Sequence, residues 1–128
     1  MVRRIGAVLA GVLVFAVLAT AINRIVLAAW PDYAAAFPSQ DFTTEMLLAR
    51  LATALASLFG AGFAAARIAR GDRLAVVIAA GALLALGGAI HLTEPTWSTF
   101  PLWYHIAFIG MIAPCVLIAG RWGRGTAG

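Results

Sequence analysis

Four ionisable side chains lie within apolar segments of this sequence, where such groups are costly unless they are paired or reach water. They are Arg24, Arg50, His91 and His105. At a rise of about 1.5 Å per helical residue, each lies roughly 24–30 Å from an arginine that flanks the same segment. We therefore expect one polar layer near the outer edge of a hydrocarbon core about 30 Å thick.

Four polar residues are close enough in sequence to be partners of this layer: Asn23, Asp41, Glu45 and Glu94. Ion pairs Arg24–Glu45 and Arg50–Glu94 would lock helices together. Alternatively, the arginines extend outward to lipid phosphates and the histidines lie in the wet interface. A third interpretation is an outward-facing polar pocket. The structural interpretations, ion pairing or snorkelling, are favoured over the pocket.

The same layer offers little for covalent or metal chemistry. His91 and His105 could ligate haem, but no carboxylate or thiolate stands at ligand spacing beside them, so no metal site and no cofactor are predicted. Ser57 and Thr53 fall in the middle of an apolar segment with no histidine nearby. Without a nucleophile–base pair, we expect no enzymatic activity.

The elements that carry this layer follow from composition. Hydrophobic residues make up 63% of the 128 residues and charged residues only 11%, whereas soluble domains are about a quarter charged. A membrane-spanning helix needs about 20 predominantly apolar residues, and no segment resembles a strand pair. We predict an all-α, polytopic membrane four-helix bundle in which residues 1–128 form a single transmembrane domain. The predicted helices cover about residues 5–30, 43–68, 74–92 and 102–120.

Local signals mark the ends and bends of these helices. Asp41 and Asp72 are suited to cap the helices that follow them, and Gly71 is suited to the position just after a helix. Pro114 should kink the last helix. The start of the chain has a second interpretation. Arg3 and Arg4, an apolar run and Ala19-Thr20-Ala21 resemble a cleaved signal peptide, but the apolar run continues to Trp30 and favours a retained helix.

Charge is distributed unequally between the two ends of the predicted bundle. One end holds seven of the nine arginines, and the other holds four of the five acidic residues with no basic residue in its loops. By the positive-inside rule, both termini are cytoplasmic. Arginine without lysine, beside abundant alanine and glycine, is typical of a GC-rich bacterial genome. We therefore predict a multi-pass protein of the bacterial inner (plasma) membrane.

The net charge of +4 indicates lipid rather than nucleic acid as a partner, because the arginines lie at the ends of apolar runs. Lipid headgroups should bind Arg67, Arg70 and Arg73. Aromatic side chains should form a belt at the outer interface: Trp30, Tyr33, Trp97, Trp103 and Tyr104.

Small residues suggest how the helices pack. Ala52, Ala56, Gly60 and Ala64 recur every fourth residue, so they share a face that admits a neighbouring helix closely. Gly81 and Ala85 repeat the pattern. Such faces occur here in a chain that has almost no residues outside its membrane-length segments. The combination favours a non-enzymatic structural or accessory subunit that forms homo-oligomers or joins a larger membrane complex. The alternative is a small transporter or export component that uses the polar pocket, and the third is a haem-bearing redox subunit.

Three segments carry a resemblance: residues 3–11, residues 62–70, and residues 100–106 with Pro101-Leu102-Trp103 before the last helix. They resemble an uncharacterised family of small bacterial four-helix inner-membrane proteins. The resemblance implies the same four-span architecture, and it brings no known activity or site. The outer loops are compact here, which weakens the idea of an external binding domain.

Overall fold

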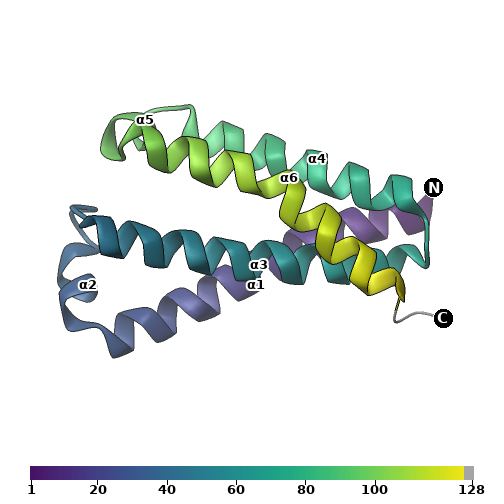
Figure 1. The fold of residues 1–128 in the computed structure, drawn as a ribbon, viewed down its shortest axis with the longest axis horizontal. Coiled ribbons are helices and arrows are strands. Elements are labelled where there is room, and N and C mark those ends of the chain that lie inside the picture. The colour runs from purple at the N-terminus through teal and green to yellow at the C-terminus, as the bar shows by residue number, and fades with distance from the viewer. Residues whose placement is uncertain (126–128) are drawn as a thin grey trace.

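The computed structural model describes residues 1–125, which form six helices and contain no strand. Four helices are long and apolar enough to cross a membrane: α1 (Val2–Ala29), α3 (Thr44–Ala69), α4 (Arg73–His91) and α6 (Leu102–Gly125). They run back and forth along one long axis (Figure 1). The all-α class and the four membrane-length helices are therefore confirmed, with ends that differ from the predicted ones by up to five residues.

Two short helices were not predicted. They are α2 (Pro31–Ala36), between α1 and α3, and α5 (Thr96–Thr99), between α4 and α6. Both lie at the same end of the molecule (Figure 1). Pro31 starts α2 because its fixed φ suits the first helical position, while the extended Trp30 separates α2 from α1.

Side chains cap the two inner helices at their starts. Asp72 caps α4 by accepting hydrogen bonds from the backbone N–H groups of Leu74 and Ala75 at 3.0 and 3.4 Å, as predicted. The predicted cap at Asp41 is wrong. Thr43 caps α3 instead, because its hydroxyl accepts from the backbone N–H three residues further on. At the end of α3, Gly71 has a φ of 90°, which glycine adopts without a steric penalty.

The α3–α4 turn is tied to the start of the chain. The Arg4 guanidinium donates from Nε to a carboxylate oxygen of Asp72 at 2.7 Å. This hydrogen bond from Arg4 lowers the pKa of the Asp72 carboxyl group below its usual value. The beginning of α1, the α3–α4 turn and the end of α6 therefore share one end of the bundle (Figure 1). We call it the arginine-rich end, and it carries Arg3, Arg4, Arg67, Arg70, Arg73, Arg121 and Arg124.

Helix α3 is the central element and packs along both α1 and α6. Close approach to α6 depends on Gly62, where an added Cβ would lie 2.3 Å from the carbonyl oxygen of Val116. The predicted small-residue face of α3 is packed only in part within the chain: Gly60 lies against Leu18 of α1, whereas Ala52 and Ala56 are exposed. Another face of α3 is buried instead, and it includes Ala61, Ala65 and Ala69.

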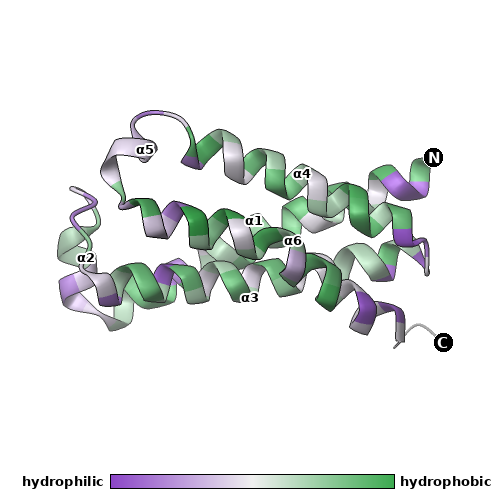
Figure 2. Ribbon diagram, turned by 45° about the horizontal axis from the view of Figure 1, so that its top comes forward, coloured by the Kyte–Doolittle hydropathy of each residue, from purple (hydrophilic) through white to green (hydrophobic). Residues whose placement is uncertain are grey.

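The long helices do not stay together over their whole length. Near the arginine-rich end, Ala7 of α1 packs with Ala75 and Ala79 of α4. Towards the other end, α1 diverges from α4 (Figure 1), while α6 continues through Pro114 and changes direction near its middle. Figure 2 shows hydrophobic residues along the four long helices and hydrophilic residues mainly near their ends. The divergence opens a space inside the bundle.

Candidate functional site

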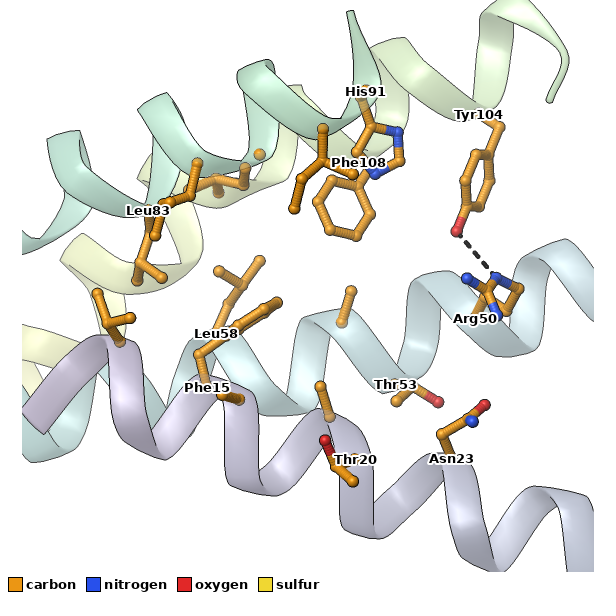
Figure 3. A pocket seen from close by; sticks show the side chains of 18 of the residues that line it. Phe15, Thr20, Asn23, Arg50, Thr53, Leu58, Leu83, His91, Tyr104 and Phe108 are labelled. Carbon is orange, nitrogen blue, oxygen red and sulfur yellow. Dashed lines mark hydrogen bonds between the residues drawn. The ribbon is translucent and has the colours of Figure 1, made fainter. Parts of the chain in front are cut away.

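A cavity of about 830 Å³ occupies this space and is lined by all four long helices. Its volume falls in the range of about 300–1,000 Å³ that is typical of ligand pockets. One end is apolar and includes Phe15, Leu58 and Leu83, and the other includes Arg50 and Tyr104 (Figure 3). The cavity is therefore amphipathic along its length.

The cavity exists because small side chains line the helices where they diverge. On α1, Ala16, Ala19 and Thr20 follow Phe15 along the cavity wall. On α4, Gly87 admits the side chain of Ile112, so that α6 packs closely behind the cavity. Large side chains at the α1 positions would fill the space that the diverging backbones leave.

At the polar end of the cavity, hydrogen bonds and cation–π contacts hold the Arg50 side chain in place. Its Nη1 donates to the Tyr33 hydroxyl at 3.0 Å, and its Nε donates to the Tyr104 hydroxyl at 3.4 Å. The guanidinium carbon lies 4.8 Å from the ring centre of Phe42 and 5.7 Å from that of Phe100. Cation–π contacts of this kind favour a guanidinium over a neutral side chain.

Both tyrosines are interior residues. Tyr33 is 1% exposed and Tyr104 2% exposed, so the prediction that they belong to an interfacial belt is wrong. The Tyr33 hydroxyl donates to Oδ1 of Asn23 at 2.9 Å, which leaves its oxygen free to accept from Arg50. Trp97 and Trp103 do remain exposed, at 43% and 41%.

The ion pairs Arg24–Glu45 and Arg50–Glu94, one of the interpretations of the polar layer, do not form in the described part of the chain. Within residues 1–125, no carboxylate oxygen lies within 4.0 Å of Arg24 or Arg50, and the ion pair found there is Arg4–Asp72. Glu45 is exposed in the first turn of α3, and Glu94 accepts a hydrogen bond from the nearby Ser98 hydroxyl. Since no Asp or Glu lines the cavity, its polar end carries two arginines without a compensating acid.

The two histidines form a buried pair beside the cavity. Their Nδ1 atoms lie 3.0 Å apart, and Nε2 of His105 lies 3.2 Å from the carbonyl oxygen of Trp97. His91 stacks on Phe108 with ring centres 4.1 Å apart. His91 lines the cavity, whereas His105 is not among the lining residues and supports His91 from behind.

The structure thus brings together most of the layer expected from helical rise. Arg24, Arg50 and His91 line one cavity, and His105 contacts His91. Glu45 and Glu94 are not among the lining residues. Sequence analysis missed Tyr33 and Tyr104 as site residues, because a tyrosine close to the end of an apolar segment is equally typical of the membrane interface. The exposed side chains at the arginine-rich end take no part in the cavity: Arg67, Arg70 and Arg73.

Within residues 1–125, no group of three or more His, Cys, Asp or Glu side chains is placed to hold a metal ion. No protein-family model matches the chain, and no curated protein and no solved structure matches it. The cavity and the groups that line it are therefore the features of this chain that bear on its function.

Proposed function

We propose that the chain is a multi-pass integral membrane protein whose cavity binds an amphipathic ligand with an anionic head group. The observation that carries this proposal is the Arg50 guanidinium, which lines the cavity without a carboxylate within 4.0 Å among residues 1–125. A charge in a membrane-embedded site is costly unless an opposite charge compensates it. Tyr33 and Tyr104 supply neutral acceptors only, so an anionic ligand is the missing partner.

The hydrogen bonds of Arg50 leave one nitrogen available. Nε and Nη1 donate to the two tyrosines, and Nη2 has no partner in the described part of the chain. No buried side-chain nitrogen or oxygen there lacks a partner, so Nη2 is accessible rather than enclosed. The N–H groups of Nη2 can therefore donate to a carboxylate or phosphate oxygen, which guanidinium geometry suits well.

The rest of the cavity fits the apolar part of such a ligand. Phe15, Leu58, Leu83 and Ile112 offer hydrocarbon surface away from Arg50. An acyl chain would gain about 25 cal/mol for each Å² of apolar surface removed from water. An anionic head at Arg50 and an acyl tail between α1 and α4 satisfy both ends of the cavity at once.

The orientation that we propose places both termini in the cytoplasm of a bacterium and the polar end of the cavity at the outer side of the inner membrane. Its support is the position of seven arginines at one end. Arg67, Arg70 and Arg73 are exposed at that end and suited to phospholipid headgroups. A reporter active only in the cytoplasm should work when fused after Gly128 and fail when inserted near Gln40; the opposite pattern would contradict the orientation.

These features support the function of a small transporter or export component for an anionic amphiphile. The family of small bacterial inner-membrane proteins that the sequence resembles is consistent with this architecture. An accessory subunit is the second candidate, favoured by one observation on α4. Gly81 and Ala85 are exposed, and a Cβ at Gly81 would meet nothing within 4 Å, so a partner helix could approach there. Co-purification of one membrane complex in mild detergent would support this candidate.

The ligand proposal is tested with two lysolipids that share one acyl chain. Native mass spectrometry of the purified protein should show preferential binding of lysophosphatidylglycerol, which is anionic, over lysophosphatidylcholine, which is zwitterionic. Arg50→Gln should lower the affinity for the anionic lipid by at least about tenfold, because hydrogen bonds to charged groups contribute about 1.5–3 kcal/mol.

The matched control is Arg121→Gln, which removes one exposed arginine at the arginine-rich end, away from the cavity, and should leave the preference unchanged. Equal binding of the two lysolipids by the wild-type protein would contradict the proposal. So would an Arg50→Gln variant that keeps the full preference for the anionic lipid.

A further inference from the structure

The histidine pair has a defined hydrogen-bond direction. A carbonyl oxygen only accepts hydrogen bonds, so Nε2 of His105, 3.2 Å from the Trp97 carbonyl oxygen, must carry the hydrogen and donate it. No carboxylate within residues 1–125 lies within 4.0 Å of either imidazole ring. Since no group of opposite charge is there to compensate a proton added to either ring, we infer that both rings are neutral. A neutral His105 then has a lone pair on Nδ1.

That lone pair orients the second ring. Only one hydrogen fits between two ring nitrogens 3.0 Å apart, so Nδ1 of His91 carries it and donates to Nδ1 of His105. Nε2 of His91 consequently has no hydrogen and is an acceptor. It has no partner in residues 1–125, where every buried side-chain nitrogen has one, so it is accessible from the cavity that His91 lines.

We propose that the ligand carries a hydrogen-bond donor, a hydroxyl group, close to its anionic group, and that this hydroxyl donates to Nε2 of His91. Tyr104 brings the two binding groups together: its hydroxyl accepts from Arg50, and its ring centre lies 5.7 Å from that of His91. The ligand class is thus a hydroxylated anionic amphiphile. This inference rests on the proposed function and adds the selection of a hydroxyl group to it.

The arrangement also predicts what the site rejects. Stacking on Phe108 covers one face of the His91 ring, and His105 holds its Nδ1 edge, so the ring cannot turn Nδ1–H towards the cavity. An ether or ester oxygen in place of the hydroxyl group has no hydrogen to donate, so it and Nε2 of His91 would be two acceptors facing each other. A site built to accept from a hydroxyl discriminates against analogues that lack it, because its own polar group is left unpaired.

The test compares three probes that differ only beside the carboxylate: hexadecanoate, its β-hydroxy derivative and its β-methoxy derivative. Isothermal titration of the full chain in detergent micelles should show the hydroxy acid binding about threefold to tenfold more tightly than the other two, the effect of one hydrogen bond. His91→Phe retains the ring that stacks on Phe108 and should abolish this preference while hexadecanoate still binds. A fourth probe, the α-hydroxy acid, covers the neighbouring position on the acyl chain.

A second measurement does not depend on any ligand or variant. Long-range ¹H–¹⁵N correlation spectra of the ¹⁵N-histidine-labelled protein should show the Nε2–H form for His105 and the Nδ1–H form for His91. An Nε2–H form for His91 would overturn the inference.

Two binding outcomes separate this inference from the proposed function. If hexadecanoate binds in an Arg50-dependent manner and neither hydroxy acid binds more tightly, the hydroxyl inference is wrong and the anionic ligand stands. If none of the acids binds but lysophosphatidylglycerol does, the hydroxyl inference is wrong and the proposed function stands. If neither the acids nor the lysolipid binds, or if Arg50→Gln binds them as well as the wild type does, the proposed function is wrong and the hydroxyl inference fails with it.

Discussion

Gly62 at the crossing of α3 and α6 allows a quantitative test of the packing that supports the cavity. A Cβ there would lie 2.3 Å from the carbonyl oxygen and 2.8 Å from Cα of Val116, whereas ordinary contacts begin at 3.4 Å. Because these are backbone atoms, no side-chain rotation relieves the overlap, and the helices must separate by about 1 Å. Overpacking of this kind costs about 1–3 kcal/mol, and alanine recovers about 0.5–1 kcal/mol of helix propensity. We expect Gly62→Ala to lower the free energy of unfolding by about 1 kcal/mol, the middle of the net range of about 0–2.5 kcal/mol.

The assay is unfolding in mixed detergent micelles, followed by helical circular dichroism, with two matched glycine controls. A Cβ at Gly81 meets nothing within 4 Å, so Gly81→Ala should be as stable as the wild type or more so. A Cβ at Gly60 would overlap with Cδ1 of Leu18, at 2.3 Å, and make an ordinary contact with Val14 at 3.5 Å; because the end of the Leu18 side chain can rotate, Gly60→Ala should lie between the other two. Equal stability of Gly62→Ala and Gly81→Ala would refute the reasoning. Since α3 carries Arg50, Gly62→Ala should also weaken binding of the anionic lysolipid.

Tyr33→Phe should lower both stability, by about 1–3 kcal/mol, and affinity for the anionic lysolipid, because it leaves Nη1 of Arg50 unpaired; unfolding and native mass spectrometry measure the two effects. Since Arg4 lowers the pKa of Asp72, the stabilisation by the ionised carboxylate is present above its unfolded pKa, near pH 4, and is lost as pH falls through the lowered native pKa. Thermal unfolding measured at a series of decreasing pH values should therefore show a smaller loss of stability for Arg4→Gln than for the wild type. The absorption spectrum of the purified protein should show no Soret band, and a Soret band would establish the haem-bearing function.

Part of this structure could be predicted from sequence because lipid imposes a simple length rule. Each of the four long helices occupies one of the predicted apolar segments. The shared depth of Arg24, Arg50 and His91 could also be predicted, since the rise per residue is a property of every α-helix. Asp72 was found as a cap because the residue type and its position before an apolar run are both local signals.

The partners of these residues could not be predicted, because they depend on how each helix is rotated and where the chain folds back. Tyr33 reaches Arg50 only because α2 starts anew at Pro31 and places the Tyr33 hydroxyl between Asn23 of α1 and Arg50 of α3. A period of four placed Ala52 and Ala56 on a packed face, but the face of α3 that meets its neighbours lies elsewhere on the helix. Spacing along one helix does not determine which side its neighbours cover.

The two arginines of the cavity illustrate why depth alone does not assign a role. Arg24 is exposed, so its long side chain is able to extend towards lipid phosphates, as a snorkelling residue does. Arg50 lies at a similar expected depth, but two tyrosine hydroxyls and the Phe42 ring hold its guanidinium, and moving it outward would break all three contacts. A side chain held this firmly, with no carboxylate within 4.0 Å among residues 1–125, is poorly explained as a lipid anchor. It is well explained as a binding group, because its position is fixed before the anion arrives and little conformational entropy is lost when the anion binds.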